Sequence, residues 1–153
     1  MKRVALITFI LLCFVNCNAQ SKKNNLSDKI DLTYHDFLNL KLQILAAQIS
    51  SGSYTIVDMG KFLFPVSISL NRQNIIVFKI EGDLDLSLPI DKQKEIMQEG
   101  FQFVKVSIME LLRLDFPLLD FDSFNNIIGF WNYVEAYDPC ARWERDEFSW
   151  IRN

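Results

Sequence analysis

The sequence predicts an α+β fold of two layers, in which two helices, at about residues 33–50 and 90–114, cover a mainly antiparallel sheet. Two long segments repeat apolar residues at helical spacing, whereas a segment between them alternates apolar and polar residues as a strand does. Elements with one apolar face bury it by packing in layers. The 153 residues are 50% hydrophobic and 23% charged, which is typical of a folded chain of one domain.

The first helix is predicted over residues 33–50. Thr33 is placed as its N-cap, with Asp36 three residues later in a capping-box arrangement. The apolar stripe is Leu38, Leu42, Leu45 and Ile49. Ser51 and Gly52 supply the stop signal.

Strands are predicted between the helices. Residues 54–57 are β-prone, and Met59-Gly60-Lys61 is expected to turn this early strand into the next one. Residues 65–81 alternate and are interrupted by the polar cluster 71–74, so they predict a hairpin with one wet face.

The second helix opens at Pro89 and ends before Pro117. Its apolar face is Met97, Phe101, Val104, Ile108 and Leu111. Gly100 lies within this helix and indicates either a close approach of helix and sheet or a break.

The C-terminal third is interpreted as two or three strands. Residues 127–137 alternate, and Asp138-Pro139 forms a turn before Trp143 and Trp150. A helix with Asp138 as N-cap and Pro139 at its first position is the alternative for residues 139–150.

The N-terminus resembles a bacterial signal peptide. Lys2 and Arg3 precede the apolar run 4–15, which is too short for a membrane-spanning helix. The expected cleavage follows Ala19, so the mature chain begins at Gln20, has a polar, disordered leader over 20–29 and a single domain over 30–153, and contains no transmembrane helix. We therefore expect a product exported to the periplasm or the extracellular space.

An alternative is a surface lipoprotein acylated at Cys17, although Asn16 departs from the small residue expected before such a cysteine. Cleavage after Ala19 removes Lys2 and Arg3 but no acid, which changes the net charge from −3 to −5. It also leaves Cys140 as the one cysteine, so no disulfide is expected within the chain.

Several kinds of catalytic and binding site are disfavoured. The one histidine, His35, lies in the first turn of a predicted helix, and the ligands of a usual zinc site are missing. The glycines are scattered singly and the chain is acidic, so neither a phosphate-binding loop nor a nucleic-acid surface is predicted. We expect no cofactor and no metal.

Acidic residues supply the runner-up function, an exported hydrolase with paired carboxylates. The two clusters are Glu81, Asp83 and Asp85, and Asp115, Asp120 and Asp122. Counted from Asp83, an EF-hand would need glycine and glutamate where Leu88 and Lys94 stand, so calcium binding is not predicted. Solvated acids at the ends of strands and helices are the expected explanation of both clusters.

The C-terminal aromatic residues are the candidate binding surface. They are Trp131, Tyr133, Tyr137, Trp143 and Trp150. Tryptophan and tyrosine are enriched at binding hot spots, but they also fill sheet cores, so both roles stay open. The leading hypothesis is a small non-enzymatic protein of a bacterial envelope that binds a protein partner, as an inhibitor or immunity protein would.

The signal peptide gives the first prediction. Exported protein should begin at Gln20, because the charged start, the apolar run and the small residues at the cut are mutually consistent. N-terminal sequencing or intact mass measures this directly. A product that begins at a lipid-modified Cys17, or one that is not cleaved, would contradict it.

Overall fold

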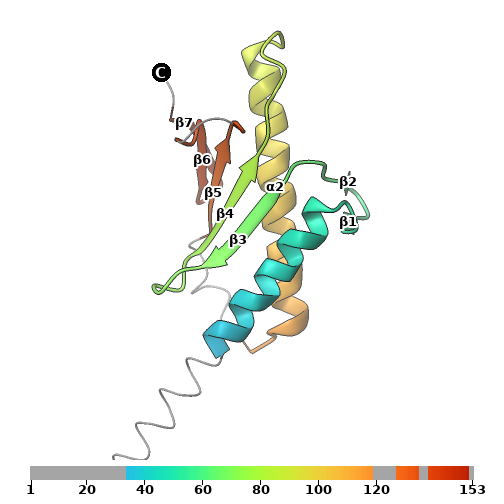
Figure 1. Cartoon of the computed structure of the whole chain (residues 1–153), viewed down its shortest axis with the longest axis vertical. Coiled ribbons are helices and arrows are strands. Elements are labelled where there is room, and N and C mark those ends of the chain that lie inside the picture. The colour runs from blue at the N-terminus through green and yellow to red at the C-terminus, as the bar shows by residue number, and fades with distance from the viewer. Residues whose placement is uncertain (1–33, 119–126, 135–137, 152–153) are drawn as a thin grey trace, which may run out of the picture. The chain divides into compact units, whose positions relative to one another are not determined.

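The computed structural model describes residues 34–118, 127–134 and 138–151 (Figure 1). The described residues from Leu38 onward form one compact unit. The elements after the first helix, residues 34–50, are β1 (Thr55–Ile56), β2 (Gly60–Lys61), β3 (Val66–Leu70), β4 (Ile76–Glu81), α2 (Ile90–Asp115), β5 (Ile127–Asn132), β6 (Ala141–Glu144) and β7 (Glu147–Trp150). The predicted α+β class is confirmed.

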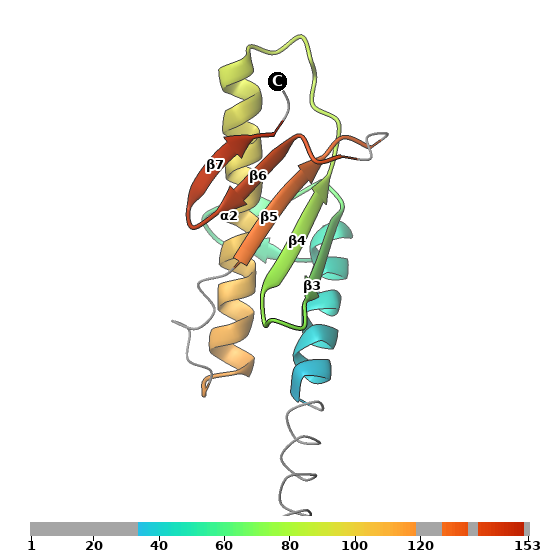
Figure 2. The same cartoon turned by 90° about the vertical axis from the view of Figure 1, so that its left-hand side faces the viewer.

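The main sheet has the order β3-β4-β5-β6-β7. Three of its neighbouring pairs are antiparallel, but β4 and β5 run parallel, with Ile76 opposite Ile127. The parallel pair follows from the path of the chain, because α2 carries it from the end of β4 back to the start of β5 (Figure 2). The sheet is therefore mixed, which the prediction of a mainly antiparallel sheet did not specify.

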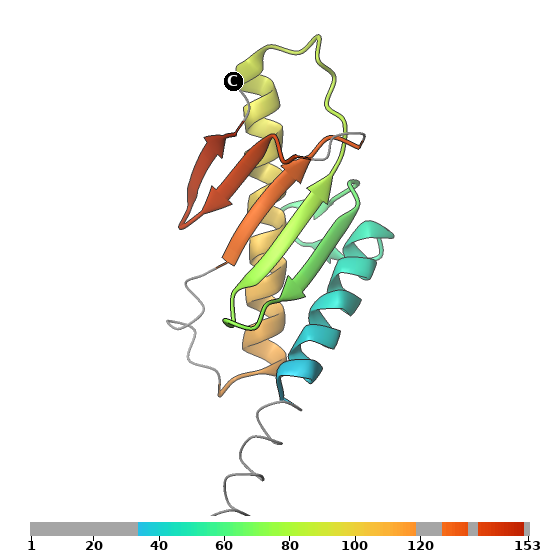
Figure 3. The same cartoon turned by 60° about the vertical axis from the view of Figure 1, so that its left-hand side comes forward.

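The first helix, over residues 38–50, and α2 lie on the same face of the main sheet (Figure 3). The first helix buries the four leucine and isoleucine residues of its predicted stripe, together with Ala46. In α2 the predicted stripe is buried, with Leu112 taking the place of Leu111 at its last position. The described part of the chain contains no helix that is both long and apolar enough to cross a bilayer.

Glycines bring α2 and the sheet together. A Cβ atom at Gly100 would lie 2.7 Å from Cζ3 of Trp131 and 3.0 Å from Cε2 of Phe62. A Cβ atom at Gly129 would lie 2.4 Å from Cζ of Phe78. Aromatic rings therefore occupy the space that side chains at these positions would need, and Gly100 marks a close approach within an unbroken helix.

The two short strands β1 and β2 differ from the prediction. They pair with each other in a separate two-stranded sheet, with Thr55 opposite Lys61. Gly60 belongs to the second strand of this small hairpin and has a φ of 74°, a conformation that suits glycine at the end of a three-residue loop. The segment 59–61 therefore belongs to the β1–β2 hairpin and does not turn β1 into β3.

Residues 141–150 are strands and not a helix. The turn between β6 and β7 consists of Arg145 and Asp146, whose φ values of 51° and 65° are those of a type I′ hairpin. Because such a turn matches the twist of the flanking strands, it fixes the register of β6 and β7.

The packing at Gly100 generates a prediction. Alanine would gain about 1 kcal/mol in helix propensity, but the clash with Trp131 should cost about 1–3 kcal/mol. We expect Gly100→Ala to lower the free energy of unfolding by about 1 kcal/mol net, measured by denaturant melts. In a Trp131→Phe background, where the Cζ3 atom of the indole is gone, the same substitution should cost less. A Gly100→Ala variant more stable than the wild type would refute this account.

Candidate functional site

Two adjoining hollows lie along α2, and we call them together the α2 groove. Their volumes are about 610 and 460 Å³, and their linings share Met59 and Glu99. Met59 comes from the loop between β1 and β2, whereas Glu99 comes from α2. The small hairpin and the long helix therefore form this groove together.

The larger hollow has an aromatic wall from the last two strands. Trp143 of β6 and Phe148 of β7 line it opposite Gln98 and Gln102 of α2. The ammonium group of Lys105 lies 5.1 Å from the centre of the Trp143 ring, within cation–π range. Lys105 also forms an ion pair with Asp146 of the β6–β7 turn, so its charge is already compensated.

The smaller hollow is lined by residues of the segment that leads into β3. Phe62 and Phe64 of this segment line it together with Ile96 and Phe103 of α2. Phe62 stacks on Phe103 with ring centres 5.3 Å apart. Phe62 also packs against Phe64, and Phe64 packs against Trp131 in the core. Neighbouring rings therefore hold this wall of the groove in place.

Large apolar side chains stand exposed beside the smaller hollow. Val57 and Leu63 have 99% and 83% of their surface exposed, and Met59 has 37%. Scattered apolar residues are ordinary on a protein surface, but a cluster beside a groove indicates an interaction site.

The lining of the groove carries three carboxylates and two ammonium groups. At the larger hollow, Asp146 pairs with Lys105, and the ammonium group of Lys94 lies 5.7 Å from the centre of the Phe148 ring. In the smaller hollow, Glu99 and Asp58 face Lys61. Over the residues that the structure describes, Glu99 has no hydrogen bond or ion pair, but its charge contributes, after that of Glu95, to the raised pKa of Lys92. Glu99 lines both hollows.

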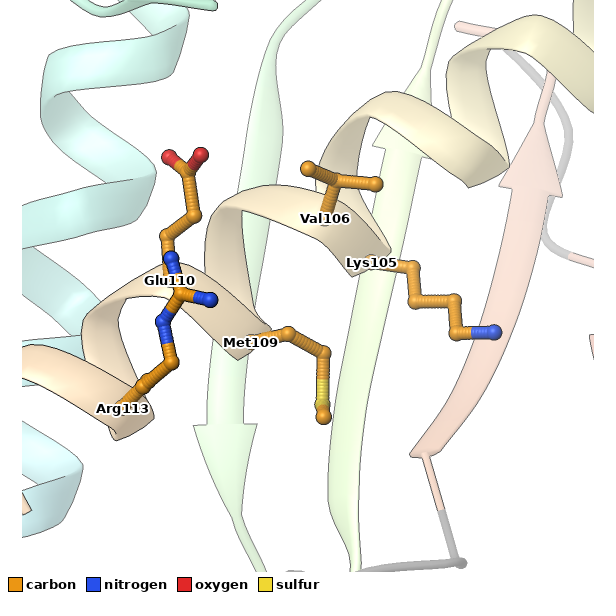
Figure 4. Close-up of a pocket in the computed structure, with 5 residues that line it drawn as sticks. All are labelled: Lys105, Val106, Met109, Glu110 and Arg113. Atoms are coloured by element: carbon orange, nitrogen blue, oxygen red, sulfur yellow. The ribbon is translucent and has the colours of Figure 1, made fainter. Parts of the chain in front are cut away.

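A third hollow, of about 450 Å³, follows further along α2 (Figure 4). Lys105 and Met109 project to one side of the helix, and the carboxylate of Glu110 to another. The Glu110 carboxylate accepts a hydrogen bond of 2.8 Å from the Tyr54 hydroxyl. Burial, and then this bond to Glu110, raise the pKa of Tyr54 above its ordinary value. The Tyr54–Glu110 contact therefore fixes β1 to α2 rather than forming a reactive centre.

The five predicted aromatic residues do not form one surface. Trp131 is completely buried, and Trp143 is buried with one side towards the α2 groove. Tyr133 and Trp150 are half-buried against the core. Tyr137 lies outside the described residues. Of the five, Trp143 is the residue that the structure brings to the groove.

The acidic clusters of the sequence serve local structure where they are described. Asp83 accepts a hydrogen bond from the backbone of Val134, and Asp85 accepts one from the backbone of Ser87. The bonds from Ser87 lower the pKa of Asp85. Asp115 pairs with Lys41 at 2.8 Å, whereas residues 120 and 122 fall outside the described ranges.

Within the described ranges, no group of three or more His, Cys, Asp or Glu residues is placed to hold a metal ion. The thiol of Cys140 is buried and donates to the carbonyl oxygen of Trp131 at 3.2 Å.

Comparison of this chain with protein-family models, with curated proteins and with solved structures gives no match. The α2 groove is therefore interpreted from its own residues. Sequence reasoning did not select Met59 or Glu99, because a loop methionine and an exposed helix glutamate carry no signal until the chain is folded.

The burial of the tryptophans generates a prediction that separates core from surface. We expect Trp131→Ala to lower the free energy of unfolding by about 3–5 kcal/mol, because it leaves a large cavity beside Gly100. Trp150→Ala should cost clearly less, because part of that ring is already in water. Denaturant melts of the two variants measure this difference, and equal losses would contradict the assignment.

Proposed function

We propose that this chain is a small exported, non-enzymatic protein of a bacterial envelope that binds a protein partner in the α2 groove. The export half rests on the signal-peptide pattern of residues 1–19. The binding half rests on one observation, the groove itself: aromatic walls at two sides, exposed apolar side chains at its margin, and a carboxylate, that of Glu99, which lines both hollows and forms no ion pair.

The chemistry of the groove selects the partner. Trp143, Phe148 and Phe62 offer flat apolar surfaces of the kind that bury a partner's apolar side chain. Glu99 and the unequal numbers of carboxylates and ammonium groups favour a positive charge. The occupant we propose is thus a segment of a protein that carries apolar side chains next to a lysine or arginine.

Selection of a phage-displayed library of linear peptides on the mature chain tests this proposal. The enriched peptides should combine aromatic or aliphatic residues with lysine or arginine. Reversal of the central charge by Glu99→Lys should weaken their binding about tenfold or more, because a hydrogen bond to a charged group contributes about 1.5–3 kcal/mol.

The matched control is Glu95→Lys. Glu95 is exposed on the same helix one turn away, pairs with Lys92 and lines neither hollow, so its reversal should leave peptide binding nearly unchanged. Failure of the library to enrich any peptide would overturn the proposal. Equal binding by the wild type and Glu99→Lys would overturn it as well.

A further inference from the structure

The two edge strands of the main sheet, β3 and β7, differ in whether their outward main-chain groups are hydrogen-bonded. At the β3 edge, side chains of the first helix accept the hydrogen bonds that a neighbouring strand would otherwise take. The Oδ1 atom of Asn39 accepts from the backbone N–H of Leu70 at 2.9 Å, and the Oγ atom of Ser50 accepts from that of Val66 at 2.8 Å. The first helix thus covers this edge at Val66 and at Leu70, on both sides of Ile68.

The β7 edge has its main-chain groups directed outward. Glu147 lies opposite Glu144 across the two-residue turn, and Ile151 donates to the carbonyl of Cys140 at 2.9 Å. Because antiparallel strands alternate, Ser149 then faces β6, and the N–H and C=O groups of Phe148 and Trp150 face away from the sheet. Among the described residues, none accepts from or donates to these outward groups.

This edge is only four residues long and begins with the charged Glu147, but it lacks the other usual protection against pairing. Natural edge strands are commonly guarded by lysine, proline, a bulge or a covering element. The sequence of β7 is Glu-Phe-Ser-Trp, which contains neither lysine nor proline, and its register with β6 shows no bulge.

We propose that the β7 strands of two copies of this chain pair antiparallel about a two-fold axis and join their sheets into one. Of the antiparallel registers that join outward groups, one engages both Phe148 and Trp150 of each copy. Phe148 lies opposite Trp150 of the second copy and each such pair exchanges both hydrogen bonds, while Ser149 lies opposite Ser149 of the second copy on the axis.

This register makes the strand complementary to itself. Phe148 and Trp150 point to the helix-covered face, where their rings already meet within one copy at 5.4 Å, so each aromatic ring gains an aromatic neighbour across the axis. Glu147 falls opposite the apolar Ile151 of the second copy. No like charges lie opposite each other along the paired β7 strands. A second copy of the chain is therefore complementary to the open β7 edge.

The oligomeric state of the mature chain tests the proposal. Sedimentation velocity should show a dimer for the wild type. Ser149→Asp should shift it to the monomer, because it places two carboxylates opposite each other on the axis. The control is Ser67→Asp, an exposed serine on the same face of the sheet but on the covered β3 edge, which should stay dimeric. Melting curves check that both variants fold.

A cross-link tests the register. Residues in a non-hydrogen-bonded antiparallel pair have Cα atoms about 4.5 Å apart, which is within reach of a disulfide. Ser149→Cys should therefore form a covalent dimer under mild oxidation, whereas Ser67→Cys should not. A monomeric wild type, a dimer unaffected by Ser149→Asp, or no cross-link at position 149 would each overturn the proposal. Because Phe148 lines the α2 groove as well as the β7 edge, peptide binding is tested on a different variant, Glu99→Lys in α2, and the two proposals can fail separately.

Discussion

The indole of Trp131 in β5 brings together three segments that are far apart in the sequence. Its ring lies against Gly100 in the middle of α2, and its N–H donates to the carbonyl of Gly82, directly after β4, at 2.9 Å. A buried indole N–H needs a hydrogen-bond acceptor, and the side chains around this one are apolar. The close approach of α2 to the sheet is therefore held at this residue.

Local patterns explain why much of the fold was predictable. The helical periods, the polar turn at 71–74 and the two prolines around α2 act within a few residues, and both helices and the β3–β4 hairpin were correctly predicted. The parallel pairing of β4 with β5 was not predicted, because it depends on which strands meet after α2 has crossed the sheet. The β1–β2 hairpin was missed because two-residue strands carry too little alternation to be recognised.

The candidate site was predictable only in part for a related reason. Alternation assigns residues to faces but does not say which face is covered, so Trp131 and Trp143 looked equally suited to core and surface. The structure places both on the covered face, and Trp143 reaches the groove because α2 leaves the outer strands partly uncovered. Glu99 and Met59 are forty residues apart in the sequence, and the local pattern around neither residue predicts that they line the same groove.

The parallel pair at the centre of the sheet determines the order in which the chain can fold. The β3–β4 and β6–β7 hairpins close short loops, whereas β4 and β5 can meet only after all of α2 has been bridged. Until residues 127–132 arrive, β4 lacks one of its two neighbours and the inner face of α2 lacks Trp131. Such non-local pairing slows folding. Truncation anywhere before β5 should therefore yield a chain with an open central strand, prone to associate with others of its kind.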